Sequence, residues 1–75
     1  MDHMKTTTVD ARGLSCPEPV IMTKKVLDGA PERCTVIVDA VAARENVTRY
    51  ARSQGYTVSV LEDEDEGEWT LMLSR

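Results

Sequence analysis

The residues best suited to chemistry stand in one string, Cys16-Pro17-Glu18-Pro19. Proline lacks a backbone N–H and holds φ near the helical value, so the two prolines predict the first turn of a helix. The N–H groups of that turn have no acceptors within the helix, and the positive end of the helix dipole favours a nearby negative charge. Cys16 lies at or beside the predicted N-cap and is therefore placed to react as a thiolate, the nucleophilic form of cysteine. We expect an exposed, reactive sulfur here.

The other groups that could bind a metal or form a disulfide are few. The second cysteine is Cys34, the only histidine is His3, and no Cys-x-x-Cys pair is present, so the sequence predicts no metal site. A helix of about twelve residues between the two cysteines would separate them by roughly 18 Å, well beyond the ~7 Å that a disulfide tolerates. We therefore expect no bridge between them and interpret Cys34 as a small buried apolar residue.

The length and composition of the chain limit what it can be. Its 75 residues are enough for a single small domain, residues 1–75, which would bury about 60% of the surface that the unfolded chain exposes. Such a domain leaves no room for a deep cavity and an organic cofactor, so we expect no cofactor. No apolar run reaches the ~18 residues of a membrane span and no signal peptide is visible, which predicts a cytoplasmic protein. We expect residues 1–5 to be disordered or partly left over from cloning.

The charge of the chain is unevenly distributed. The formal net charge is −4, but residues 62–68 contain six acids in seven positions. Without these six, seven acids remain against nine bases, so the rest of the chain carries +2. This is not the strongly basic surface of a nucleic-acid-binding protein. We interpret the acidic segment as a solvated hairpin loop, because it lacks the flanking helices and the final glutamate of a calcium-binding loop.

The elements that must position Cys16 follow from periodicity. We predict strands at residues 6–10, 34–38, 56–61 and 69–73, and helices at residues 17–28 and 42–54. The order β-α-β-α-β-β predicts an α/β (α+β) two-layer sandwich, in which a four-stranded mixed sheet carries both helices on one face and its first two strands are parallel. The other face of the sheet is predicted to show Thr35, Ile37, Thr57, Leu61, Thr70 and Met72.

The apolar positions predict the face that each helix buries. In the first helix these are Val20, Thr23, Val26 and Leu27, with Ile21 nearly opposite and exposed. In the second helix they are Ala43, Val47, Tyr50 and Ala51, and Gly55 ends that helix. The pattern also places all three aromatic residues, Tyr50, Tyr56 and Trp69, in the core.

Several residues before the helix could support the cysteine. Asp10 can accept backbone N–H groups in the turn, and Gly13 can adopt a positive φ. Arg12 could pair with the charge on the sulfur or with an acidic partner, or it could be an ordinary solvated arginine. Asp39, at the end of the second strand, is predicted to cap the second helix and could also touch a partner.

Residues after the cysteine could contact a partner protein. Glu18 is favoured by the helix dipole in any protein, but it could also tune the thiolate or touch a partner. An apolar and basic patch beside the motif suits docking, although scattered apolar residues are common on protein surfaces. This patch consists of Ile21, Met22, Lys24 and Lys25.

The string from Val9 to Val20 resembles the signature of the TusA/SirA/YedF-like sulfur-carrier family, Asp-x-x-Gly-Leu-x-Cys-Pro-x-Pro. The matching positions are Asp10, Gly13, Leu14, Cys16, Pro17 and Pro19. The resemblance covers the chain from Thr8 onward and implies the same β-α-β-α-β-β fold. Residues 39–56 look most like the YedF branch, some members of which are linked to selenium metabolism. The chain departs from TusA-type members, which often carry Asp-Pro after the second strand, because Ala40 follows Asp39 here. This departure counts against a role in transfer-RNA thiolation.

The resemblance implies a function for Cys16 as the thiol that carries sulfur as a persulfide. Its partners would be a cysteine desulfurase or another persulfide donor, a downstream acceptor protein, and a domain resembling the DsrE family, which often follows in the YedF branch. We expect a monomeric carrier that is not an enzyme in the turnover sense, because no general base or oxyanion site accompanies Cys16. One alternative is a regulatory or redox-sensing interaction module without sulfur transfer. A nucleic-acid binder is the weakest alternative, because the body carries only +2.

Overall fold

The computed structural model describes residues 6–75 of the chain. The expectation for residues 1–5 lies outside this range. The elements follow the predicted order, and their ends agree with the prediction to within two residues. They are β1 (Thr6–Asp10), α1 (Glu18–Leu27), β2 (Arg33–Val38), α2 (Val41–Ser53), β3 (Thr57–Asp63) and β4 (Glu68–Ser74).

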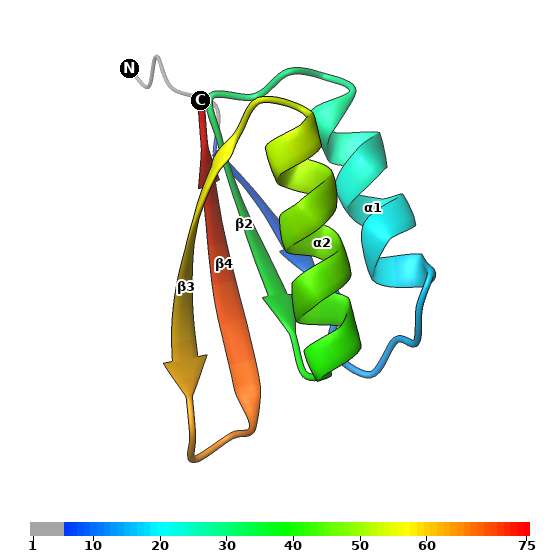
Figure 1. Cartoon of the computed structure of the whole chain (residues 1–75), viewed down its shortest axis with the longest axis vertical. Helices are drawn as coiled ribbons and strands as arrows, with labels where there is room; N and C mark the ends of the chain where they lie inside the picture. Colours follow the sequence, from blue (N-terminus) through cyan, green and yellow to red (C-terminus); the bar gives the residue numbers. More distant parts are fainter. Residues whose placement is uncertain (1–5) are drawn as a thin grey trace.

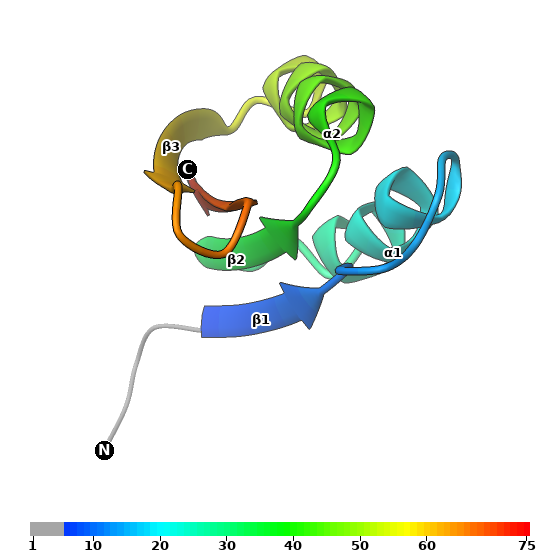
Figure 2. The same ribbon diagram turned by 90° about the horizontal axis from the view of Figure 1, so that it is seen from below.

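The four strands form one mixed sheet in the order β1-β2-β4-β3. β1 pairs with β2 in parallel, and β4 lies antiparallel to both β2 and β3. Both helices cover the same face of this sheet, as Figures 1 and 2 show. The predictions of a two-layer sandwich and of parallel first and second strands are therefore confirmed. The carboxyl ends of β1 and β2 meet at the same edge, where Ala11 N–H donates to the Ile37 carbonyl at 2.8 Å.

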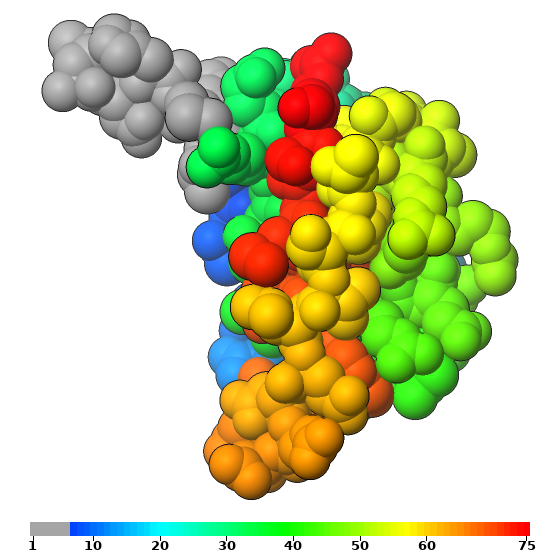
Figure 3. Space-filling model, turned by 60° about the vertical axis from the view of Figure 1, so that its left-hand side comes forward, coloured from blue at the N-terminus to red at the C-terminus, as the bar shows by residue number. Residues whose placement is uncertain are grey.

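The acidic segment forms a hairpin, and the loop between its two strands is shorter than predicted. Glu62 and Asp63 belong to β3 and Glu68 to β4, where Asp63 pairs with Glu68. The turn closes through Gly67 at φ 67°, and Glu66 N–H donates to the Asp63 carboxylate at 3.2 Å. In Figure 3 this hairpin (orange) projects beyond the rest of the molecule.

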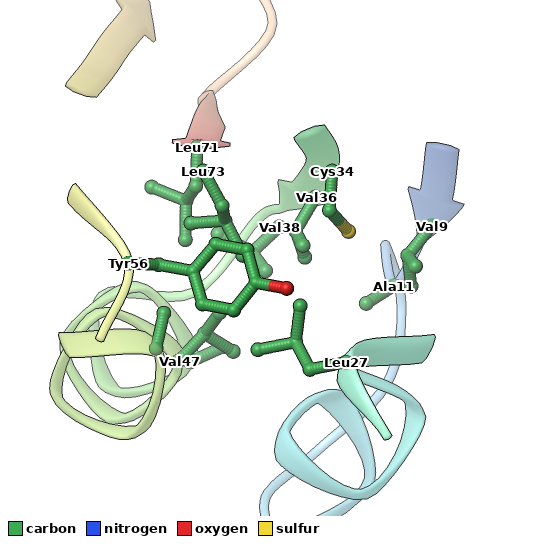
Figure 4. Close-up of a cluster of buried hydrophobic side chains, with 12 residues drawn as sticks. Val9, Ala11, Leu27, Cys34, Val36, Val38, Val47, Tyr56, Leu71 and Leu73 are labelled. Atoms are coloured by element: carbon green, nitrogen blue, oxygen red, sulfur yellow. The ribbon is translucent and has the colours of Figure 1, made fainter. Parts of the chain in front are cut away.

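The core lies between the sheet and the helices (Figure 4). Its largest fully buried apolar side chains include Val36 and Val38 of β2, Val47 of α2, and Leu71 and Leu73 of β4. The Tyr56 ring is 5% exposed, and its hydroxyl donates to the Pro31 carbonyl at 2.7 Å. The prediction of a buried aromatic is confirmed for Tyr56, whereas Tyr50 and Trp69 are half-buried at the margin of the core.

Each helix buries close to the predicted face. α2 buries the small residues Ala43, Val47 and Ala51, and Gly55 ends the helix region with φ 89°. α1 buries Thr23 and Leu27 together with Pro19, while Val20 and Val26 are half-buried. Thr23 is tolerated in the core because its hydroxyl donates to the Pro19 carbonyl at 2.8 Å. Ile21 is 45% exposed, as predicted.

The face of the sheet opposite the helices carries no layer in the part of the chain that the structure describes (Figure 2). Leu61 and Met72 are exposed there, as predicted, whereas Thr35 and Ile37 are half-buried among their neighbours. Across residues 6–75, no helix is both long and apolar enough to cross a membrane.

Candidate functional site

Cys16 lies on the surface, immediately before α1. Pro17 is the N-cap residue of α1 and the helix begins at Glu18, so the prediction that Cys16 lies beside the N-cap is confirmed. The expected supply of free N–H groups is smaller than the sequence suggested. Pro17 and Pro19 have no N–H, and Glu18 N–H already donates to the Ser15 carbonyl at 3.0 Å. The hydrogen bond that the Cys16 sulfur accepts therefore comes from another part of the chain.

That hydrogen bond comes from α2. The Asn46 side-chain amide donates from Nδ2 to Cys16 Sγ at 3.2 Å, across thirty positions of sequence. Its orientation places a donor at the atom that would carry the negative charge of a thiolate. Sequence reasoning missed Asn46. The available signal was a polar stripe of α2 at positions i, i+3 and i+7, namely Asn46, Arg49 and Ser53.

A shallow groove of about 460 Å³ opens beside Cys16 between the two helices. We call it the thiol groove. Its walls are mainly apolar and carry one cation, Arg49. Ser53 uses its hydroxyl to donate to the Tyr50 carbonyl at 2.6 Å, within α2. The thiol groove is lined by Cys16, Pro17, Val20, Asn46, Arg49, Tyr50 and Ser53.

The loop before Cys16 is held at its start by Arg12. The Arg12 guanidinium donates to both carboxylate oxygens of Asp10, at 2.9 and 2.8 Å, and to Glu68 at 3.2 Å. Arg12 N–H also donates to Asp10 Oδ1 at 3.2 Å, which confirms the predicted role of Asp10 as an acceptor in the turn. The side-chain hydrogen bonds from Arg12 lower the pKa of Asp10 to about 2 and raise the pKa of Arg12. Arg12 is thus engaged by carboxylates, and it ties the loop to the base of the acidic hairpin.

The middle of the loop is held by Asp39. Gly13 has φ 77°, as predicted, and its N–H donates to Asp39 Oδ2 at 2.9 Å. The prediction that Asp39 caps α2 is wrong, because the N-cap residue is Ala40 and no side chain caps this helix. The physical reason is the parallel pairing of β1 and β2, which brings the Gly13 amide next to the end of β2. Leu14 then packs against the core and fixes the loop just before Cys16.

The other predicted partner contacts remain on the surface of α1. Glu18, Ile21, Lys24 and Lys25 are exposed, and none of them lines the thiol groove. Lys24 forms an ion pair with Asp28 at 3.3 Å. The structure therefore brings together Cys16 with residues of α2 rather than with the exposed side of α1.

Residues 7–75 match the profile of the family described as sulfurtransferase TusA. The chain belongs to this family. It is 38% identical over 69 residues to a Methanocaldococcus jannaschii protein provisionally named sulfur carrier protein MJ0990, an alignment that covers 89% of this chain and 91% of the relative. It is 35% identical over 68 residues to YrkI of Bacillus subtilis, also provisionally named a sulfur carrier, covering 87% and 88% of the two chains.

A solved structure supports the same placement. The crystal structure of a SirA-like protein from Desulfitobacterium hafniense superposes with a TM-score of 0.82 at 37% sequence identity, covering 91% of this chain and 95% of that one. The resemblance to the TusA and SirA proteins and the fold that it implied are therefore confirmed. The names of the relatives indicate a role in sulfur transfer for this TusA-family chain.

The second cysteine of this TusA-family protein is set apart from the groove. Cys34 is 1% exposed within the core, and burial raises the pKa of its thiol. Both cysteines are free, so the prediction of no disulfide between them is confirmed. Within residues 6–75, no cluster of three or more histidine, cysteine or acidic side chains is arranged to hold a metal ion.

Proposed function

We propose that this TusA-family chain is a carrier that accepts sulfane sulfur on Cys16 as a persulfide and delivers it to an acceptor protein. The observation that carries the proposal is the exposed Cys16 sulfur, which accepts a hydrogen bond from Asn46 at 3.2 Å in an open groove. The other cysteine, Cys34, is inaccessible in the core. A small protein with one reachable thiol suits a role in which two different partners must contact the same sulfur.

Loading is a displacement at sulfur. The Cys16 thiolate attacks the outer sulfur of a donor persulfide, R–S–SH, so that a bond forms between Sγ and that sulfur. The S–S bond of the donor breaks, and its electron pair leaves with the donor thiolate, R–S⁻. Delivery repeats this step with the acceptor as the nucleophile and Cys16 as the leaving thiolate. No external oxidant or reductant is consumed, because the sulfane sulfur keeps its oxidation state throughout.

Asn46 supports delivery through charge. Negative charge develops on Cys16 Sγ as it leaves the transferred sulfur, and a hydrogen bond to a charged acceptor is stronger than one to a neutral acceptor. The apolar walls of the thiol groove, Pro17, Val20 and Tyr50, suit the polarisable sulfur atoms of the two partners. The carrier supplies a nucleophile and a contact surface, and the partners supply the remaining catalytic groups.

The same proposal extends to the partners of the carrier and to the element that it carries. The donor is a cysteine desulfurase or another persulfide enzyme, and a DsrE-like domain is a candidate partner. Selenium could be carried by the same displacement chemistry. Cytoplasmic location and closeness to the YedF branch stay predictions. The same holds for partner contacts through Arg12, Glu18, Ile21, Lys24, Lys25 and Asp39.

Intact-protein mass spectrometry tests the proposal. Wild type, Cys16→Ser and Cys34→Ser would each be mixed with a cysteine desulfurase and cysteine, or with inorganic polysulfide. We expect a gain of one sulfur atom on wild type and Cys34→Ser that a reductant removes, and no gain on Cys16→Ser. A gain that persists in Cys16→Ser would move the chemistry to Cys34. The absence of any gain on wild type would favour an interaction module without sulfur transfer.

A further inference from the structure

We infer that the exposed side of α2 is the docking surface for an acidic segment of the protein that gives or takes the sulfur. This surface, which we call the arginine face, consists of Arg44, Arg49 and Arg52. The inference deepens the proposed function, because it assigns a partner surface to the same thiol. It differs from the sequence-based expectation, which placed partner contacts on α1 and at Arg12 and Asp39.

The arginine face is continuous with the thiol groove. A second groove of about 540 Å³ lies along α2 and is lined by the arginine face together with Glu45, Thr48 and Val60. Arg49 lines both grooves. A segment whose sulfur lies at Cys16 can therefore continue along α2 past Arg49, whereas no residue of the α1 patch lines the thiol groove. Figure 3 shows α2 (green to yellow) as an uncovered ridge beside β3.

Two of the three guanidinium groups have no carboxylate of their own. Within residues 6–75, neither Arg49 nor Arg52 forms an ion pair, and both are exposed. Arg44 is held over the Trp69 ring at 5.0 Å and contacts Glu45 at 3.4 Å. Three positive charges against Glu45 leave +2 on this side of α2, although the whole chain carries −4. The charge beside the thiol thus has the opposite sign to that of the chain, and it selects an acidic partner.

The second groove also offers contacts other than charge. Val60 of β3 is 45% exposed and lines this groove together with the three arginines. An exposed apolar side chain beside arginines is typical of protein interfaces.

An acidic protein segment fits this surface better than a nucleic acid does. A nucleic acid carries a regular row of phosphates that would extend past α2. The acidic hairpin lies near α2 and has six acids in residues 62–68, so it repels a long polyanion. A short acidic segment can lie on the arginine face and end at Cys16 without crossing that hairpin. The α1 lysines offer less, because Lys24 is paired with Asp28 and neither Lys24 nor Lys25 lines a groove that contains Cys16.

The test measures how fast Cys16 attacks peptides of different charge. Each short peptide carries one cysteine as a mixed disulfide with thionitrobenzoate, and its other residues are glutamate, glutamine or lysine. The Cys16 thiolate attacks the peptide sulfur, the mixed disulfide breaks, and the released thionitrobenzoate is read by its absorbance. The proteins are wild type, Arg49→Glu/Arg52→Glu, Arg49→Gln/Arg52→Gln and the matched control Lys24→Glu/Lys25→Glu. Cys16→Ser supplies the background, and circular dichroism checks that α2 is retained.

We expect the glutamate peptide to react about tenfold faster than the glutamine peptide at low salt, the lower end of electrostatic steering. High salt and the Arg→Glu pair should abolish this preference, the Arg→Gln pair should reduce it, and the lysine control should keep it. Equal rates for the three peptides, or an equal loss in the lysine control, would overturn the inference. Stronger competition from a short RNA than from an acidic peptide of equal charge would assign the face to nucleic acid and also overturn it.

This assay needs no persulfide, so it can fail or succeed independently of the proposed function. A charge preference on the arginine face without sulfur loading of Cys16 would keep the docking surface and remove the carrier role. Sulfur loading without a charge preference would keep the carrier role and remove the docking surface.

Discussion

Asp39→Ala should loosen the loop that presents Cys16. The variant removes one hydrogen bond, from Gly13 N–H to Asp39 Oδ2 at 2.9 Å. Hydrogen bonds to charged groups contribute about 1.5–3 kcal/mol, and we take about 1 kcal/mol here because Asp39 is exposed. With 1.36 kcal/mol for each factor of ten, the loop should open about fivefold more often. Amide hydrogen exchange at Glu18, read by NMR, measures this opening, because its acceptor, the Ser15 carbonyl, lies in the same loop and is left in place by the substitution.

Two matched variants make the result specific. Asp39→Asn keeps a neutral acceptor and should give an intermediate increase in exchange at Glu18. Asp65→Ala removes the same charge from the exposed hairpin turn and should leave exchange at Glu18 unchanged. If Asp39→Ala left exchange at Glu18 unaltered, or if Asp65→Ala accelerated it equally, the loop would not depend on this contact. The argument that β2 positions the thiol would then be refuted.

Three further outcomes follow from single contacts. Asn46→Leu removes the donor to Cys16 Sγ and should slow the release of sulfur from loaded Cys16 to a small thiol by up to roughly fivefold, as expected from about 1 kcal/mol on the leaving thiolate, whereas an unchanged initial rate in mass spectrometry would count against its role. Tyr56→Phe leaves the Pro31 carbonyl without its partner and should cost about 1 kcal/mol, or roughly 4–8 °C in a thermal melt. Burial raises the pKa of Cys34, so the folded protein keeps this proton to higher pH than the unfolded chain, whose cysteine pKa is about 8.5. The associated stability is present below that value and is lost as pH rises through the folded pKa. The urea midpoint should therefore fall more steeply in alkali for wild type than for Cys34→Val, and parallel curves would contradict this reasoning.

The fold was predictable because its signals are local. Alternation at Tyr56–Leu61 and Trp69–Leu73 predicted two strands, but not their full length. Glu62, Asp63 and Glu68 are poor strand formers, and the antiparallel ladder extends through them because each pairs with a residue of the opposite strand. Propensity describes one strand at a time, whereas this extension is a property of the pair.

The site was predictable in Cys16 and in the adjacent turn, where Asp10 accepts an N–H group and Gly13 has a positive φ. Cys16 stood out because the two prolines fix its local structure, whereas the groups that contact the loop come from distant segments. Asp39 has the right residue type and position for a helix cap, but its carboxylate accepts the Gly13 N–H instead. Asn46 looks like an ordinary polar residue on a helix until α1 and α2 lie side by side. Such contacts depend on how elements pack, which one-dimensional patterns do not encode.

The exposure of Cys16 also has a kinetic consequence. The thiol groove is open, so nothing in the described chain shields an atom bound to Sγ from solvent. If Cys16 carries sulfur as proposed, that atom is open to attack by the acceptor, by small thiols and by peroxide, because attack at sulfur depends on access. The yield of delivery is then a ratio of two rates, capture by the acceptor and scavenging by solutes. For such a protein, the abundance and proximity of the acceptor determine the lifetime of the bound sulfur atom more than any feature of the fold.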